Sequence, residues 1–391
     1  MRMSQDLRSA GLSTRAVHAG DPARALDAPV NTPIVQSSTF YSDPDGAGEL
    51  LYSRYGNGPN NVAVEARIAA LEGAEDCVAV GSGMAAMACA LLACVRAGDH
   101  VLAAEALYGG TRTLLVRELS RLGVEASFVD FFADDWREAL RPNTRVLLAE
   151  TVSNPLLRVP DLRPLADGAH EAGAKLVVDS TFATPVNARP LQSGADLVVH
   201  SATKYLGGHS DLTAGAVLGG AELVGEARRR AQVWGPALDP HAAWLLERGI
   251  KTLALRMERH NRNGLEVAGR VEGLPGVARV HYPGLPSHPD HEVARRVLCG
   301  FGGMVGIEVE GGAEGAGRFA RALRLAKVAP SLGGVETLVS EPRHTSHAAF
   351  TPAEREALGI RDGFFRFSMG IEDADDIVAD VEQALEAVNG A

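Results

Sequence analysis

One lysine, Lys204, stands where an amine could do chemistry. It occurs in the run His200-Ser201-Ala202-Thr203-Lys204-Tyr205-Leu206-Gly207-Gly208-His209, directly after the apolar run 196–199, which predicts a buried strand. An amine at such a strand end is poorly placed for a solvated charge and well placed to form a Schiff base with the aldehyde of pyridoxal phosphate (PLP). Ser201 and Thr203 can then bind the phosphate. The alternative is a surface lysine after a strand, because short motifs also match by chance.

A carboxylate 25 positions upstream favours the first interpretation. The run Lys175-Leu176-Val177-Val178-Asp179 predicts an apolar strand that ends in an acid. PLP acts as an electron sink when its pyridine nitrogen is protonated, and a carboxylate stabilises that proton. Asp179 is suited to this role because open α/β sheets bind ligands at the carboxyl ends of their strands. A turn-forming aspartate is the alternative, but Asp179 and Lys204 together are more specific than either alone.

Three further motifs supply groups that a PLP site needs. Gly83 and Met84 open a predicted helix after a strand, and a helix N-terminus offers unpaired N–H groups to a phosphate. Tyr108 precedes two glycines at the next such junction, where its ring can stack on the pyridine. Tyr52 and Arg54 lie in an irregular segment, and an arginine can bind phosphate through two hydrogen bonds. Each motif has an ordinary alternative: a simple turn, a half-buried tyrosine and a solvated arginine.

The bulk composition agrees with an enzyme. The net charge of −11 argues against nucleic acid or an anionic membrane as a partner. The four cysteines (Cys77, Cys89, Cys94 and Cys299) lack metal-ligand spacing, so we expect no metal and a reducing compartment. The first residues lack an apolar signal core, and we see no apolar run of about 18 residues or more. We therefore expect a soluble, cytoplasmic protein.

The elements that must position these residues predict an α/β fold. Residues 1–60 are rich in Pro, Asn, Ser and Gly, which predicts an irregular N-terminal arm that packs on a partner subunit. Residues 61–250 alternate helical and strand patterns, and this alternation predicts a mostly parallel sheet with helices on both faces. A long helical stretch at 241–271 leads into residues 251–391, which we interpret as a smaller C-terminal α/β domain.

Taken together, these motifs resemble the Cys/Met-metabolism family of PLP enzymes, which carries out trans-sulfuration. The resemblance runs over nearly the whole chain, from the segment 14–20 to the segment 366–373. It includes Ser153-Asn154-Pro155, the run 282–289 and Ser331-Leu332-Gly333-Gly334. It implies the fold type I of PLP-dependent transferases, PLP as cofactor, and a homodimer or a dimer of dimers.

The resemblance also implies a role for each site residue. Lys204 forms the Schiff base and moves protons, Asp179 pairs with the pyridine nitrogen, and Tyr108 stacks on the ring. Gly83, Met84, Ser201 and Thr203 hold the phosphate, while Tyr52 and Arg54 reach the cofactor of the neighbouring subunit. Arg366 binds the substrate carboxylate beside Asn154 and Ser331, and Glu150 lies near the ring. For Arg366 the alternative is a structural ion pair with the acids at 372–376.

Several positions depart from the pattern of the γ-lyases and γ-synthases. Leu51 and Pro330 stand where many of those enzymes have acids, and Thr113 stands where they have an arginine that Arg112 partly replaces. Gly110 occupies the position of a cysteine that is typical of methionine γ-lyases. The segment 342–347 ends in Ser-His, which also occurs in some plant-type β-lyases.

The resemblance therefore implies γ-elimination or γ-replacement on cystathionine or an O-acylhomoserine and leaves the exact reaction open. Cystathionine β-lyase, methionine γ-lyase and O-acetylhomoserine sulfhydrylase activities are alternatives. A catalytically silent PLP-fold binding protein is the alternative from another class.

Overall fold

A seven-stranded sheet forms the centre of the larger part of the molecule. The computed structural model describes residues 7, 9–22, 25–133, 135–346, 348 and 350–389. The strands are β1 (Asp76–Val80), β2 (His100–Ala104), β3 (Glu125–Val129), β4 (Thr144–Glu150), β5 (Lys175–Asp179), β6 (Leu197–His200) and β7 (Gly215–Gly219). They lie in the order β1-β7-β6-β5-β4-β2-β3, and only the pairs that include β7 are antiparallel. The predicted mostly parallel sheet is confirmed.

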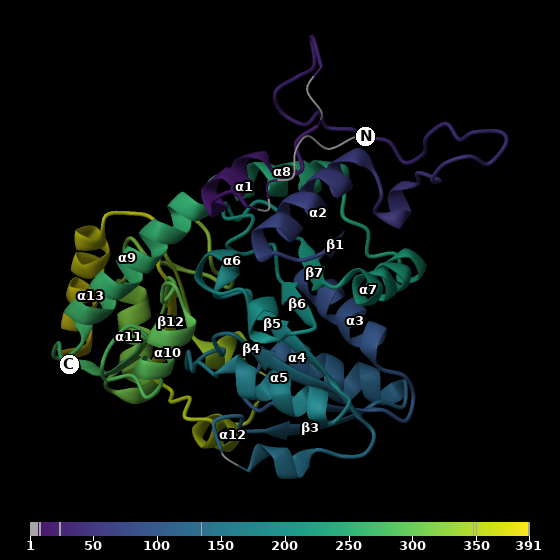
Figure 1. Cartoon of the computed structure of the whole chain (residues 1–391). Coiled ribbons are helices and arrows are strands. Elements are labelled where there is room, and N and C mark those ends of the chain that lie inside the picture. Colours follow the sequence, from purple (N-terminus) through teal and green to yellow (C-terminus); the bar gives the residue numbers. More distant parts are fainter. Residues whose placement is uncertain are drawn as a thin grey trace.

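Helices cover both faces of this sheet, as predicted (Figure 1). Side chains alternate between the faces along each strand, so Val178 and Val198 join one core cluster while Val177 and Val199 join the other. The first face carries α2 (Pro59–Glu72), α5 (Leu162–Glu171) and α8 (Pro240–Ile250), and the second carries α3 (Gly83–Cys94) and α7 (Ala221–Trp234). The shorter α-helices are α1 (Leu12–His18), α4 (Gly109–Thr113) and α6 (Thr184–Asn187), and α4 continues into the π-helix η2 (Leu114–Leu119). The 3-10 helices are η1 (Ser53–Tyr55), η3 (Trp136–Ala139), η4 (Pro190–Ser193) and η5 (Pro342–His344).

A second sheet of five strands organises the C-terminal part. Its order is β10-β11-β12-β9-β8, built from β8 (Val277–His281), β9 (Met304–Val309), β10 (Lys327–Val328), β11 (Leu338–Ser340) and β12 (Phe364–Ser368). The accompanying helices are α9 (Leu253–Val271), α10 (His291–Val297), α11 (Gly312–Ala322), α12 (Pro352–Ala357) and α13 (Ala374–Asn389). Apolar side chains of α9, α11 and α13 bury one face of this sheet, and α10 instead contributes Ala294 to the core of the larger sheet.

The helical stretch predicted at 241–271 is helical in the structure and consists of two helices, α8 and α9. The chain turns after Ile250, and the Thr252 hydroxyl donates to the Gly249 carbonyl at 3.2 Å. Leu246 and Ile250 of α8 pack under the larger sheet. Helix α9 continues in that core with Leu253 and Met257 and then reaches the smaller sheet with Val267 and Val271.

Helix α1 packs on the body beside α2, whereas much of the segment 25–52 projects from it (Figure 1). Leu26 and Val30 are 94% and 92% exposed, and Tyr41 is fully exposed. Several large apolar side chains exposed to solvent within one segment are typical of a surface that packs on another chain. Among the described residues, no helix is long and apolar enough to cross a membrane.

Candidate active site

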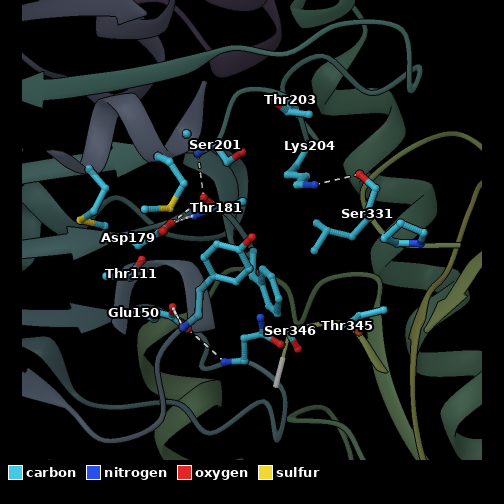
Figure 2. A pocket seen from close by; sticks show the side chains of 18 of the residues that line it. Thr111, Glu150, Asp179, Thr181, Ser201, Thr203, Lys204, Ser331, Thr345 and Ser346 are labelled. Atoms are coloured by element: carbon cyan, nitrogen blue, oxygen red, sulfur yellow. Dashed lines mark hydrogen bonds between the residues drawn. The ribbon is translucent and has the colours of Figure 1, made fainter. Parts of the chain in front are cut away.

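The carboxyl ends of β4, β5 and β6 open into a cavity of about 690 Å³. Parallel strands end at the same edge of a sheet, so Asp179 at the end of β5 and Lys204 after β6 meet there. Figure 2 shows the two side chains across this cavity from each other. Eleven of the thirteen site residues predicted from the sequence line it: Gly83, Met84, Tyr108, Glu150, Asn154, Asp179, Ser201, Thr203, Lys204, Ser331 and Arg366.

One wall of the cavity presents donors suited to an anion. Ser82 caps α3 by accepting from the Ala85 N–H at 3.1 Å. Gly83 and Met84, whose N–H groups have no acceptor within the helix, line the cavity. A Cβ on Gly83 would lie 2.6 Å from the Ser201 side chain, so only glycine lets α3 approach this strand end so closely. The Thr203 hydroxyl is held in place because it donates to the Ala214 carbonyl and accepts from the Ala214 N–H.

Asp179 is held by Thr181, a residue whose role the sequence analysis missed. Thr181 donates to Asp179 Oδ1 from its hydroxyl at 2.5 Å and from its backbone N–H at 2.9 Å, and its hydroxyl also accepts from the Ser201 N–H. The aspartate is thereby joined to the loop that carries Lys204. The available signal was the threonine two residues after a strand-end aspartate, because an aspartate side chain closes an Asx turn by accepting from the N–H two residues later. Burial raises the pKa of Asp179, so this carboxylate favours a cationic partner in the cavity.

Lys204 is largely withdrawn from water. Its Nζ donates to Ser331 Oγ at 2.8 Å, as Figure 2 shows. Burial, and after it the positive charge of Arg366, lower the pKa of Lys204 to about 8. An amine with such a pKa is partly neutral near pH 8, and a neutral amine is the nucleophilic form.

Glu150 connects two loops of the cavity. Its Oε1 accepts from the Tyr108 N–H at 2.8 Å and its Oε2 from the Asn154 N–H at 3.0 Å. Glu150 is the register partner of Asp179 on the neighbouring strand. Burial and the nearby Asp179 charge raise the pKa of Glu150 to about 8, because two buried carboxylates so close together resist joint ionisation.

Arg366 projects from β12 into the cavity and is 6% exposed. Its Nη1 donates to Asn154 Oδ1 at 2.9 Å, and its Nε has no hydrogen-bond partner among the described residues. An under-satisfied buried guanidinium is suited to bind a carboxylate through two parallel hydrogen bonds. The alternative ion pair with the acids at 372–376 is wrong, since within that run Asp373 binds Arg259 and Asp375 binds Arg270.

Comparisons with known proteins decide the family. The model of the Cys/Met metabolism PLP-dependent enzymes matches residues 13–386. The chain belongs to this family. It is 43% identical to a cystathionine gamma-lyase of Bacillus subtilis over 96% of this chain and 99% of that one, and 41% identical to an L-methionine gamma-lyase of Porphyromonas gingivalis over 98% and 99%. A crystal structure of cystathionine gamma synthase from Xanthomonas oryzae pv. oryzae superposes with a TM-score of 0.94 at 37% identity, covering 97% of this chain and 99% of that one.

The protein is therefore a PLP-dependent enzyme of sulfur amino acid metabolism, and its cavity fits that cofactor. PLP presents an aldehyde, a dianionic phosphate and a basic ring nitrogen at separate corners. The cavity presents Lys204, the Ser201 and α3 N-terminal wall, and Asp179 as three separate groups of matching chemistry.

Tyr52 and Arg54 do not line this cavity in their own chain. Arg54 lies against the rings of Tyr52 and Tyr55 and donates from Nη1 to the Gln232 carbonyl at 2.5 Å. The contact of Tyr52 and Arg54 with a neighbouring subunit therefore stays a prediction. Further lining residues that the sequence analysis did not assign are Ser82, Met87, Thr111, Val152, Thr181, Phe182, Thr213, Leu332, His344, Thr345 and Ser346.

Of the positions that depart from the γ-enzyme pattern, Pro330 lines the cavity. Arg112 and Thr113 line a neighbouring cavity of about 450 Å³. A Cβ on Gly110 would lie 2.5 Å from the Tyr108 ring and 3.0 Å from the Met84 sulfur, so a cysteine there would displace the ring. His347, in the Ser-His ending, lies outside the described residues.

Proposed function

We propose that this enzyme performs γ-elimination or γ-replacement on cystathionine or an O-acylhomoserine. One observation carries the proposal: the Lys204 amine, the Asp179 carboxylate and the Arg366 guanidinium all face one cavity. An amino acid that enters it meets a nucleophilic amine and a carboxylate receptor together. The named relatives, a cystathionine gamma-lyase, a cystathionine gamma-synthase and an O-succinylhomoserine sulfhydrylase, support chemistry at Cγ.

The site residues divide the work by their chemistry. PLP, when bound, supplies the electron sink that makes Cα–H and then Cβ–H acidic. Lys204 would hold the cofactor through its aldehyde and would be the base near the substrate Cα. Asp179 would hold the proton on the ring nitrogen, and the wall of Gly83, Met84, Ser201 and Thr203 would hold the phosphate. Tyr108 would lie against the ring as a proton donor or acceptor, and Arg366 would orient the substrate through its α-carboxylate.

The proposal extends to the organisation of the chain. Residues 1–60 form an arm that delivers Tyr52 and Arg54 to a neighbouring subunit, residues 61–250 form the PLP-binding domain, and residues 251–391 form the small domain that carries Arg366. The exposed Leu26, Val30 and Tyr41 support a homodimer or homotetramer. Four free thiols support a cytoplasmic location, because reducing compartments keep cysteines unpaired.

The test is to incubate the PLP-loaded enzyme with L-cystathionine and to identify the 2-oxo acid that is released. Elimination at Cγ yields 2-oxobutyrate, ammonia and cysteine, whereas elimination at Cβ yields pyruvate, ammonia and homocysteine. We expect 2-oxobutyrate, and its complete loss in Lys204→Ala. Pyruvate would overturn the γ assignment. If neither acid forms, incubation of an O-acylhomoserine with cysteine should yield cystathionine, which makes γ-replacement the main reaction.

Methionine γ-lyase activity is a second candidate, favoured by the name of the Porphyromonas gingivalis relative. Gly110 counts against it, because the typical cysteine is missing and would collide with the Tyr108 ring as that ring stands here. Release of methanethiol from L-methionine, compared with release of cysteine from L-cystathionine in the same preparation, separates the two activities.

A further inference from the structure

A turn formed by residues 153–159 holds the groups that surround Arg366. We call it the Asn154 turn. Ser153 and Arg158 close it, since the Ser153 N–H donates to the Arg158 carbonyl at 2.9 Å and the Arg158 N–H donates to Ser153 Oγ at 3.0 Å. Asn154, at its start, accepts from Arg366 Nη1 at 2.9 Å. The position of this turn therefore sets the direction of the guanidinium.

The Asn154 turn is held on one side by the larger sheet. Glu150, the last residue of β4, accepts from the Asn154 N–H at 3.0 Å. Within the turn, the hydrogen bonds of Arg158 to Ser153 tie its far end to its start, and a contact from outside the turn is needed to fix where that far end lies against the rest of the molecule.

Asp290 supplies that second contact from the connection between β8 and β9 of the smaller sheet. Its carboxylate accepts from Arg158 Nε at 2.6 Å, from Arg158 Nη2 at 3.0 Å and from the Val159 N–H at 3.0 Å. A carboxylate that takes both prongs of a guanidinium and an adjacent backbone N–H fixes direction as well as distance. The far end of the turn is thus attached to the part of the chain that also contains β12 and Arg366.

Burial makes the loss of this ion pair more costly than the loss of one on the surface. The side chains of Asp290 and Arg158 are 8% and 31% exposed, and the Phe132 ring lies 3.9 Å from the Arg158 guanidinium carbon. A buried carboxylate that loses its cation becomes strongly unfavourable, so the structure would shift to regain a partner. Such a shift would move Asn154 and, with it, Arg366.

We propose that Asp290, through Arg158, is a positioning residue for recognition of the substrate α-carboxylate. The inference rests on the proposed function only in taking Arg366 as the carboxylate receptor. Asp290 is not among the described residues that line the cavity. It therefore acts through the Asn154 turn and touches neither substrate nor cofactor.

The experiment is a binding titration without turnover. L-2-Aminobutyrate carries the α-amine and α-carboxylate but no leaving group, and propylamine is the same skeleton without the carboxylate. Both can be titrated into the PLP-loaded enzyme while the absorbance of the bound cofactor is followed. We expect Asp290→Asn to weaken L-2-aminobutyrate about tenfold or more, because a small misplacement of an orienting group costs up to about a hundredfold. Propylamine should bind as it does to the wild type.

Two further variants keep the test decisive. Arg296→Ala removes the exposed ion pair with Asp161, which joins the same two parts of the molecule at 2.8 Å without touching the Asn154 turn, and both ligands should bind it normally. Arg158→Lys keeps the charge, loses the two-pronged contact and should fall between Asp290→Asn and the wild type. It also carries the test if Asp290→Asn does not fold.

Unchanged L-2-aminobutyrate binding in Asp290→Asn, or in Arg158→Lys where only that variant folds, would overturn the proposal. An equal loss for both ligands would overturn it too, since that points to a general distortion. Neither result depends on the leaving group. Failure of the wild type to cleave cystathionine would leave the titration intact, so the two proposals fail separately.

Discussion

The protonation state of Lys204 governs how the site first acquires its cofactor. Only the neutral amine attacks an aldehyde, and the pKa of Lys204 is lowered to about 8 from the ordinary 10.5. The rate at which apoenzyme captures PLP should therefore rise with pH and level off above a midpoint near 8. Stopped-flow absorbance at a series of pH values measures it. A rate that still climbs steeply above about pH 10 would show an ordinary lysine.

The same profile tests the contribution of Arg366 to that pKa. Arg366 is the second cause of the lowered Lys204 pKa after burial, because a like charge disfavours the ammonium. In Arg366→Gln the midpoint for PLP capture should move upward. Arg112→Gln removes a guanidinium from the neighbouring cavity and should leave the midpoint where it is. An unmoved midpoint in Arg366→Gln would assign the effect to burial alone.

The positions of single site residues could be predicted from the sequence where a local pattern determines them. Asp179 and Lys204 each follow an apolar strand, and both strands are parallel, so their meeting at one sheet edge follows from the fold. The contact of Arg158 with Asp290 joins residues 132 positions apart in two irregular segments. Neither segment has a helical or strand periodicity from which the direction of a side chain could be predicted. Such contacts depend on how the two sheets pack, which no local pattern encodes.

At the scale of elements, a buried ion pair joins α2 to α7 and β1. Glu65 on α2 accepts from Arg228 of α7 at 2.9 Å and from the Ala79 N–H of β1 at 2.8 Å. Arg228 also donates to Asp76 and to the Cys77 carbonyl. Burial raises the pKa of Glu65 to about 7, with Arg228 as the main opposing influence. Folded protein thus binds more protons at Glu65 than unfolded protein between pH 4.5 and about 7.

Removal of Arg228 should therefore destabilise the fold in a pH-dependent way. Arg228→Ala leaves Glu65 buried without a cation and should lower the free energy of unfolding by about 3 kcal/mol at about pH 8. The loss should shrink near pH 6, because a protonated Glu65 needs no cation. Urea unfolding followed by circular dichroism at both pH values measures it. Arg229→Ala, the next residue on α7, breaks an exposed pair and should change little. A loss independent of pH would contradict the role of Glu65.

The elements themselves were predictable to different degrees. β5 and β6 are apolar runs. β5 lies at 175–179 as predicted, and β6, predicted at 196–199, lies one residue later at 197–200. The turn that divides 241–271 has no proline or terminal glycine to mark it, so the periodicity reads as one helix. Helix α9 begins in the core that α8 also fills, at Leu253 and Met257, and ends in the core of the smaller sheet, at Val267 and Val271.

At the scale of the whole molecule, the arm at 25–52 is hydrogen-bonded to its own chain near Thr32 and Gln36 and leaves large apolar side chains exposed. Leu26, Val30 and Tyr41 face solvent, and Arg54 lies outside its own cavity at the foot of α7, where Trp234 is 65% exposed. A partner subunit that covers this region would bury these side chains. In the proposed arrangement, this partner would also bring its active site within reach of Arg54.

A mixture of two inactive variants tests this arrangement directly. If each site combines Lys204 of one chain with Arg54 of its neighbour, Arg54→Ala alone should retain PLP poorly, and Lys204→Ala alone should be inactive. When the two are unfolded, mixed in equal amounts and refolded, half of the paired chains should be hybrids, and each hybrid pair has one intact site. Activity should then recover to roughly a quarter of the wild type. If Arg54 serves its own chain, the hybrid has no intact site, and the mixture should stay at the level of its parents even though the subunits exchange.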